Sequence, residues 1–463
     1  MTSRYIIYLI SFIVSIIISV RLGPYYLGIW GVMQMFVGYF NKINFGIPYS
    51  AQLLMLQNKD AEDRYRNVFF NSLIVNSLLI FGVIIIAVLI GIWPLELFGK
   101  YDITWQFYVI CLIAALDYYN MLFLNVFRVT NQIFEVAFQQ SIFPLLKLSV
   151  VFFAKDSSLV NLLLFANLGS VILPLLLFII RNRIQIKTAV LKLNIVKEII
   201  VKGWYLFIYN CCFFLILLVL RTIVSKYYTV EEFGNFNFAY SLSNAILLLV
   251  DAVAFLLYPK LLSVFSSHNL QLIKKQMLDA RSLYLTLVNL LMYLALLFFP
   301  IIQLIFTEYK YLTTALSYVA MIIMMSVFHF GYSTFLIAQK MEKQAALTSI
   351  VSLVINVIGG VIIAKYLKAG FQYVMLAPVI AHFTGALLCF IFTCKKIHLS
   401  FLKDFFSYRI MGPFFLYVIF TIWNFQIAKY LVFILFIILN ISEIKKISNS
   451  IIKIYHNPHM MDI

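Results

Sequence analysis

The sequence has little charge. Only 11% of its 463 residues are Asp, Glu, Lys or Arg, whereas 63% are hydrophobic. Soluble domains carry about 25% charged and about 45–50% apolar residues. Surface-to-volume scaling limits the core of a soluble protein, which cannot bury this much apolar side chain. The composition therefore excludes an ordinary soluble protein and indicates a chain that resides in a lipid bilayer.

Cysteine is also scarce. The five cysteines lie almost entirely within apolar runs and have no metal-ligand spacing; they are Cys111, Cys211, Cys212, Cys389 and Cys394. We therefore expect no metal site and no cofactor. The first apolar run ends in Arg-Leu-Gly-Pro rather than in a small-x-small site, so we expect no cleavable signal peptide.

Acidic residues are fewer than basic ones. There are 18 Asp and Glu against 35 Lys and Arg, which gives a formal net charge of +17. No basic segment is interleaved with base-stacking aromatic residues in a soluble context, so we do not expect nucleic-acid binding. The excess fits Lys and Arg that fix the orientation of a membrane protein from its cytoplasmic loops.

Long apolar runs are the dominant feature. Backbone amides in hydrocarbon must be satisfied within the protein, so spans are helices or a closed barrel. The runs here are continuous over about 20 residues, the length that a crossing helix needs, whereas barrel strands would alternate. We predict an all-α integral membrane protein with about 12–14 transmembrane helices. The spans lie near residues 5–20, 28–49, 68–93, 103–125, 139–154, 159–180, 203–224, 234–258, 283–306, 311–337, 346–364, 372–393, 410–424 and 427–442. The last two are short, so one long tilted helix with an interfacial piece is an alternative.

The basic residues predict the orientation. With the N-terminus in the cytoplasm, 24 of the 35 Lys and Arg fall on the inner side. This bias predicts a multi-pass protein of the plasma (inner) membrane. The longest predicted outer loop, 94–102, has nine residues. A membrane glycan polymerase normally needs a sizeable outer loop for its catalytic residues, so we expect no enzyme.

Two stretches suggest an internal repeat. Residues 21–34, RLGPYYLGIWGVMQ, align with residues 227–240, YYTVEEFGNFNFAY, so that Gly28 meets Gly234. Each stretch follows the first span of a set of six, as in the parallel repeats of secondary transporters. We predict a six-helix lobe over 1–186, an interfacial linker over 187–202, a second lobe over 203–400, and one or two further helices with a cytoplasmic tail over 401–463.

The first of these stretches predicts a re-entry turn. Gly23 and Pro24 stop the first helix, because proline offers no amide hydrogen. Gly28 lets the next helix start close against its neighbour.

Residues 22–32, LGPYYLGIWGV, and 44–55, NFGIPYSAQLLM, resemble the start of Wzx-type O-antigen flippases. These belong to the multidrug/oligosaccharidyl-lipid/polysaccharide (MOP) exporter superfamily, and the shared pattern is Leu22-Gly23 followed by Gly28. The resemblance implies two pseudo-symmetric, MATE-like six-helix bundles around a central cavity. It implies that an oligosaccharide repeat unit on polyprenyl diphosphate is moved from the inner to the outer leaflet by alternating access. A glycan polymerase is then a functional partner, and membrane lipids surround the protein.

A few ionisable residues lie at membrane depth, where they usually face a cavity or one another. The candidates for the substrate cavity are Lys42, Lys147, Arg221, Asp117 and Asp251. A cation there suits a diphosphate, which needs a counter-charge in a low dielectric. For Lys147 a structural ion pair with Asp117 is the alternative, and for Arg221 it is simple snorkelling. Lys42 and Asp251 occupy similar depths in equivalent spans, so they either form a gate or are solvated separately.

Two histidines lie within predicted spans. His329 and His382 either titrate in a proton-coupled cycle or are hydrogen-bonding packing residues; H⁺ or Na⁺ is the expected coupling ion. The other functions that fit the sequence are a flippase for another glycan precursor (capsule, teichuronic acid or peptidoglycan) and a MATE-like small-molecule exporter.

Overall fold

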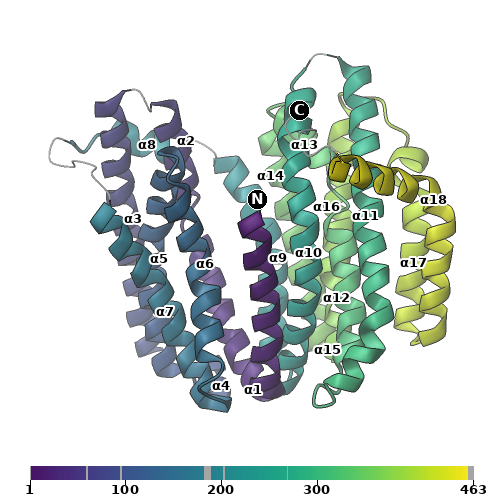
Figure 1. The fold of residues 1–463 in the computed structure, drawn as a ribbon, viewed down its shortest axis with the longest axis horizontal. Helices are drawn as coiled ribbons and strands as arrows, with labels where there is room; N and C mark the ends of the chain where they lie inside the picture. Colours follow the sequence, from purple (N-terminus) through teal and green to yellow (C-terminus); the bar gives the residue numbers. More distant parts are fainter. Residues whose placement is uncertain are drawn as a thin grey trace. The chain divides into compact units, whose positions relative to one another are not determined.

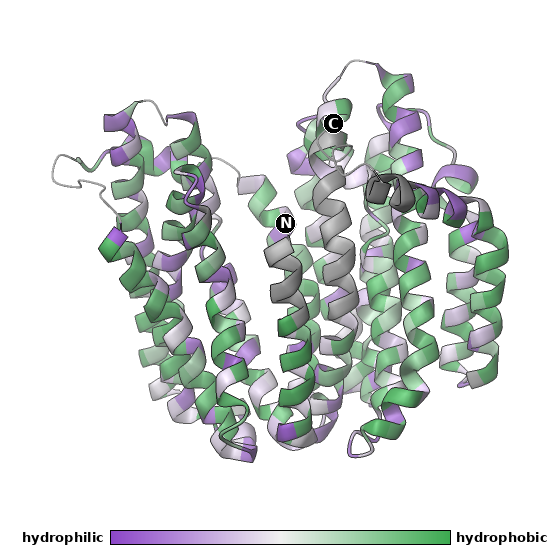
Figure 2. Cartoon of the chain, in the orientation of Figure 1, coloured by the Kyte–Doolittle hydropathy of each residue, from purple (hydrophilic) through white to green (hydrophobic). Residues whose placement is uncertain are grey.

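The computed structural model describes residues 2–58, 61–93, 96–181, 189–201, 204–267 and 269–456 (Figure 1). These residues form helices and loops and contain no β-strand, which confirms the predicted all-α fold. Nine of the described helices are long and apolar enough to cross a membrane, and two shorter apolar helices accompany them. Hydrophobic residues cover the middle of the helices, and hydrophilic residues gather toward their ends (Figure 2).

The helices follow one another with short connections. In chain order they are α1 (Thr2–Lys42), α2 (Ile47–Gln57), α3 (Glu62–Ile92), α4 (Glu96–Tyr101), α5 (Thr104–Val129), α6 (Ile133–Val150), α7 (Asp156–Arg181), α8 (Leu193–Val201), α9 (Trp204–Tyr227), α10 (Val230–Phe265), α11 (Leu270–Ile305), α12 (Leu312–Ser326), α13 (Tyr332–Ala338), α14 (Glu342–Val361), η1 (Ile362–Tyr366), α15 (Phe371–Val374), α16 (Leu376–Cys394), η2 (Phe401–Phe405), α17 (Tyr408–Ile422) and α18 (Gln426–His456). Each predicted span overlaps a helical segment, but not every span is one unbroken helix: 28–49 runs from the end of α1 into α2, and 311–337 runs from α12 into α13. The last two spans are separate helices, α17 and α18, because the chain turns at Asn424 with φ 58°. The alternative of one long tilted helix is therefore wrong.

Glycine and proline interrupt α1 at the predicted position. Gly23 has φ 63° and ψ 176°, which is not helical. The positive φ suits a residue without a Cβ atom, and Pro24 supplies no amide hydrogen to the helix. The first two predicted spans are thus two arms of α1 that meet at Gly23.

The chain divides into two compact units. The first comprises residues 1–211 and 221–238, and the second comprises 212–220 and 239–463. Both α9 and α10 contribute residues to each unit. The residue bounds of the four predicted segments stay a prediction.

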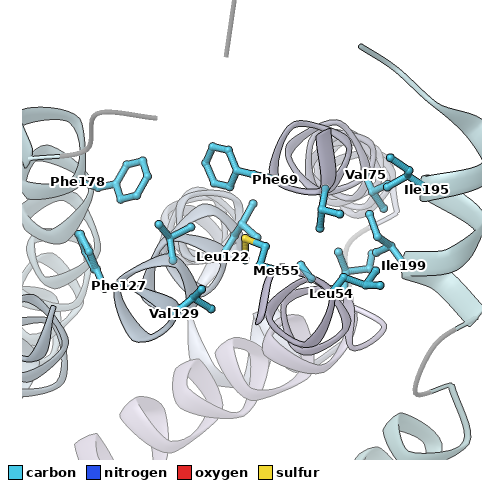
Figure 3. Close-up of a cluster of buried hydrophobic side chains, with 14 residues drawn as sticks. Leu54, Met55, Phe69, Val75, Leu122, Phe127, Val129, Phe178, Ile195 and Ile199 are labelled. Atoms are coloured by element: carbon cyan, nitrogen blue, oxygen red, sulfur yellow. The ribbon is translucent and has the colours of Figure 1, made fainter. Parts of the chain in front are cut away.

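The first unit is packed around an apolar cluster (Figure 3). The cluster joins Leu54 and Met55 of α2, Phe69 of α3 and Leu122 of α5 with side chains of α7 and α8. Ile195 and Ile199 place one face of α8 on this cluster, within the predicted linker. Lys187 and its neighbours 182–188 lie outside the described residues.

Buried asparagines tie the helices of the first unit together. Asn120 donates to the carbonyl of Val171 at 2.7 Å, and Asn125 donates to the carbonyl of Pro48 at 2.7 Å. Side-chain amides of this kind link helices in membranes, where the apolar surroundings give little driving force for association.

Small residues pack the second unit. The facing helices α14 and α16 bury Ala, Ser, Thr and Gly side chains, which lets the two backbones approach closely. A Cβ atom added at Gly359 would lie 3.4 Å from the Cβ of Ala377. Asn356 of α14 donates to the carbonyl of Ile216 at 2.8 Å and holds the central part of α9.

Candidate functional site

The two repeated stretches cross within the first unit. A Cβ atom added at Gly28 would lie less than 3.0 Å from the carbonyl oxygen of Val230, and one added at Gly234 would lie less than 3.0 Å from that of Pro24. In the repeat alignment Gly28 corresponds to Gly234 and Pro24 corresponds to Val230. The two contacts are therefore equivalent under exchange of the repeats. We call this contact of α1 with the start of α10 the glycine crossing.

A third pair of equivalent residues completes the glycine crossing. Gly31 aligns with Asn237, and the two lie against each other, because a Cβ atom at Gly31 would overlap the side-chain amide of Asn237. Asn237 is only 5% exposed. Neither its Nδ2 nor its Oδ1 has a hydrogen-bond partner among the described residues. A buried amide in this state is unfavourable, because its polar atoms have left water without replacement.

Arg221 lies beside the glycine crossing. Its Nη2 donates to the carbonyl of Gly31 at 2.9 Å. On the neighbouring turns, the hydroxyl oxygens of Tyr39 and Thr222 are 2.6 Å apart. Of the predicted cavity cations, Arg221 is thus the one that the structure brings to the repeated stretch. A half-buried guanidinium can still present donors in a planar fork that matches phosphate oxygens.

Lys100 fastens α4 to the same end of the first unit. Its Nζ donates to the carbonyl of Ser225 at 2.6 Å and also to that of Tyr228. These carbonyls belong to the C-terminal end of α9, where a cation is favourable. Burial lowers the pKa of Lys100, and Glu232 and Glu231 oppose the shift.

Lys147 and Asp117 do not pair. Both are half-buried in the first unit, on α6 and α5 respectively. The Nζ of Lys147 lies 3.9 Å from the centre of the Phe143 ring. No ion pair or hydrogen bond links it to an acidic residue within the described ranges. The alternative that Lys147 serves a structural pair with Asp117 therefore has no support in the structure.

The predicted gate pair is only partly described. Lys42 is half-buried in the last turn of α1, close enough to Cys211 to interact electrostatically. Asp251 belongs to α10, but its side chain lies outside the described residues. The approach of Lys42 and Asp251 stays a prediction.

The two histidines share one aromatic ring in the second unit. His329 stacks on Phe213 with ring centres 4.6 Å apart, and His382 is parallel to the same ring at 5.9 Å. His382 is 3% exposed, and neither ring nitrogen has a hydrogen-bond partner among the described groups. For His382 the alternative of a hydrogen-bonded packing residue is thus not supported by these contacts.

Arg281 is a buried cation that the sequence analysis missed. It is 4% exposed on α11, and its Nη1 donates to the carbonyls of Phe328 and Phe330, the latter at 2.9 Å. These carbonyls belong to the break between α12 and α13. The guanidinium also lies 4.1 Å from the centre of the Tyr332 ring. The predicted span begins at residue 283 and therefore leaves Arg281 outside it. Arg281 continues the buried series Ile273–Met277 at four-residue spacing, and this spacing is the signal in the sequence that points to it.

Lys429 was also missed. It is 7% exposed near the start of α18, and its Nζ lies 3.3 Å from the hydroxyl of Ser317 on α12. The hydroxyl of Tyr417 donates to the carbonyl of the same serine at 3.0 Å. Both α17 and α18 are thereby tied to α12. This role is structural and carries no signal in the sequence beyond a lysine next to an apolar run.

No family model and no curated protein matches this sequence. Solved structures do match its fold. A structure of the lipid II flippase MurJ in an inward closed conformation has a TM-score of 0.71 at 15% identity and covers 96% of this chain and 99% of that one. A multidrug resistance MATE family transporter of the MOP superfamily, in an inward-facing conformation, has a TM-score of 0.69 at 15% identity and covers 84% of this chain and 94% of that one. The chain therefore has the fold that MATE transporters of the MOP superfamily share with the lipid II flippase.

Proposed function

We propose that this protein is a flippase for a lipid-diphosphate-linked oligosaccharide in the bacterial inner membrane. The observation that carries the proposal is Lys147, a half-buried ammonium in a predicted span whose described neighbour is an aromatic ring. A cation placed so needs a counter-charge, and the diphosphate of a lipid carrier supplies one. Such a flippase needs no covalent reaction, because the polar head group of the lipid only has to cross the bilayer.

The other candidate cations, Arg221 and Lys42, would contact the head group at different points of the transport path. Arg221, whose Nη2 donates to the Gly31 carbonyl, carries a guanidinium of the kind that binds phosphate oxygens. Lys42 lies at the other end of the same arm of α1. The head group would pass these cations in turn as the binding path opens first to the cytoplasm and then to the outside, while the lipid tail stays in hydrocarbon.

The proposed cargo is an O-antigen repeat unit on polyprenyl diphosphate. Its support is the local resemblance of residues 22–32 and 44–55 to Wzx-type flippases. The fold match to a lipid II flippase supports the wider class of diphosphate-linked glycan precursors, including those of capsule, teichuronic acid and peptidoglycan. A glycan polymerase would consume the flipped product.

We propose proton coupling through the two histidines. His329 and His382 stack on Phe213, so a proton on either imidazole changes the contacts of one shared ring. Sodium is the alternative coupling ion. Transport by right-side-out vesicles under an imposed proton or sodium gradient separates the two.

A small-molecule exporter of MATE type is the second candidate. Asp117 favours it, because this half-buried carboxylate forms no ion pair or hydrogen bond within the part of the chain that the structure describes. A carboxylate in that setting attracts a cationic cargo or a coupling cation.

The decisive experiment is deletion of the gene followed by complementation. Deletion is expected to remove long-chain surface glycan and to accumulate a single lipid-linked repeat unit. Lys147→Met is expected to reduce complementation at least about tenfold, equivalent to about 1.4 kcal/mol, whereas Asp117→Asn is tolerated. Lys395→Met is the matched control, because Lys395 is exposed and also lies near an aromatic ring, that of Phe392 at 5.1 Å. Normal surface glycan in the deletion strain rules the flippase out, and loss of drug resistance in Asp117→Asn alone favours the exporter.

A further inference from the structure

Among the described glycines, the three of the glycine crossing leave the least space for a Cβ atom. At Gly28 and Gly234 the neighbouring atoms are backbone carbonyl oxygens, which cannot turn away as a side chain can. No Cβ atom fits at either place. Where two backbones touch with no side chain between them, the passage of a polar head group is blocked.

We propose that the glycine crossing is the outer gate of the transport path, closed in this structure, and that Asn237 is the group that favours its opening. The inference rests on the proposed function. The crossing lies just after the turn at Gly23 in the first repeat and just after the start of α10 in the second. With the N-terminus in the cytoplasm, both places are at the outer face of the membrane.

The contact is built to open as a unit. The Gly28–Val230 and Gly234–Pro24 contacts are equivalent, and the Gly31–Asn237 contact follows about one helical turn later in both repeats. Separation of α1 from α10 breaks the three together. A close-packed contact of this kind has two arrangements, closed or apart, because small displacements already cost steric overlap or lost dispersion.

Asn237 opposes the closed arrangement. Its carboxamide is buried against Gly31 with donor and acceptor unsatisfied by the described protein groups. When the crossing separates, both atoms reach water or the hydroxyls of a sugar head group. Packing therefore stabilises the closed gate, and the buried polar side chain of Asn237 destabilises it. A cargo that binds the open arrangement can then shift the equilibrium between closed and open.

A disulfide across the crossing tests the proposal. In a background without the native cysteines, the variant Gly31→Cys with Asn237→Cys places two thiols where the side chains now touch. Disulfides need Cβ atoms about 3.5–4.5 Å apart. Replacement of the asparagine also clears the space that a Cβ atom at residue 31 requires. The control is Gly359→Cys with Ala377→Cys, whose Cβ atoms would be 3.4 Å apart inside the second unit.

Oxidation of the crossing variant in proteoliposomes is expected to abolish transport, and reduction is expected to restore it. The control variant is expected to transport in both states. Restored activity on reduction shows that the variant is folded. Continued transport by a crossing variant whose disulfide is complete, as measured by mass spectrometry, overturns the gate.

A second readout is independent of the cargo. Asn237→Cys alone is expected to react slowly with a membrane-impermeant maleimide added outside, and not with the same reagent added inside. If no lipid-linked glycan is flipped but this labelling occurs, the proposed function fails and the gate stands. If transport proceeds and the cysteine is never labelled from outside, the gate fails and the function stands.

Discussion

At the residue scale, glycine serves two different purposes in this chain. Gly23 provides a positive φ at a helix break. Gly28 and Gly234 lie within helices, where any residue could adopt the backbone, and are required only for the space they leave. The role of Gly23 can be predicted from the sequence, because a Gly-Pro pair interrupts a helix. The second purpose became visible only when the partner carbonyls were known.

Gly28→Ala and Gly234→Ala are expected to destabilise the protein. The added Cβ overlaps a backbone carbonyl, and overpacking of this kind costs about 1–3 kcal/mol. Gly82→Ala and Gly412→Ala are the controls, since no atom lies within 4 Å of the new Cβ at either place. These are expected to be neutral or to stabilise by about 0.4–1 kcal/mol. Thermal unfolding in detergent measures all four, and equal melting temperatures across the set would contradict the close contact.

Single residues were predicted unevenly. Lys147 and Arg221 stood out because charge is rare in apolar runs. Arg281 and Lys429 did not, because each lies near the end of a run, where a basic residue is ordinary. What sets them apart is burial, at 4% and 7% exposed, and burial depends on helices that are distant in the sequence.

At the scale of elements, the tenth predicted span is broken. α12 ends at Ser326 and α13 starts at Tyr332, so the turn between them leaves carbonyls that no helix satisfies. Arg281 donates to two of them and lies against two aromatic rings. Irregular backbone at membrane depth is tolerated only where the protein itself supplies such partners.

Arg281→Met is expected to loosen this break. The carbonyls of Phe328 and Phe330 lose their donor, and each unsatisfied group costs about 1–3 kcal/mol, offset in part by removal of a buried charge. The amides of Ser333 and Phe335, which bond to residues of the break at 3.1 and 3.0 Å, are expected to exchange hydrogen faster. Lys274→Met is the control. Lys274 lies on the same helix as Arg281, and its replacement removes one exposed hydrogen bond to the carbonyl of His398. Unchanged exchange in Arg281→Met would remove the role assigned to this residue.

Element boundaries were harder to predict than elements. α11 starts at Leu270, thirteen residues before the predicted span, because its first turns alternate Lys, Gln and Asp with apolar residues. Hydropathy detects the part of a helix in hydrocarbon and overlooks an amphipathic extension that packs on neighbouring helices. Arg281 lies in this amphipathic extension, so hydropathy did not assign it to a span.

At the scale of the whole molecule, we predict fourteen crossings, the upper end of the expected 12–14, which would place both ends of the chain on one side of the membrane. Green fluorescent protein fused after Ile463 is therefore expected to fluoresce in the cytoplasm. Alkaline phosphatase fused after Asp102, in the loop that contains α4, is expected to be active. An active phosphatase fused after Ile463 would indicate thirteen crossings and contradict the assignment of α17 and α18 as two spans.

The fold class followed directly from composition. A chain with 63% hydrophobic residues in runs of helical length has few alternatives to a helical membrane protein. The internal repeat was predicted from one degenerate alignment of two short stretches. The useful part of that alignment was the pairing of Gly28 with Gly234. The pairing of those stretches in space, and the ring shared by the two histidines, depend on tertiary packing that no local pattern encodes.

The exchange symmetry of Gly28 and Gly234 also bears on ancestry. A half-turn that swaps the two stretches leaves their mutual contacts unchanged, which is the property of an isologous interface in a homodimer. A chain built by duplication would inherit such an interface from two copies of a six-span precursor. Because the nearest atom to each glycine is a backbone oxygen of the other stretch, no replacement at residue 24 or residue 230 removes it. Residues 28 and 234 are then expected to be glycine together in every descendant that keeps this interface.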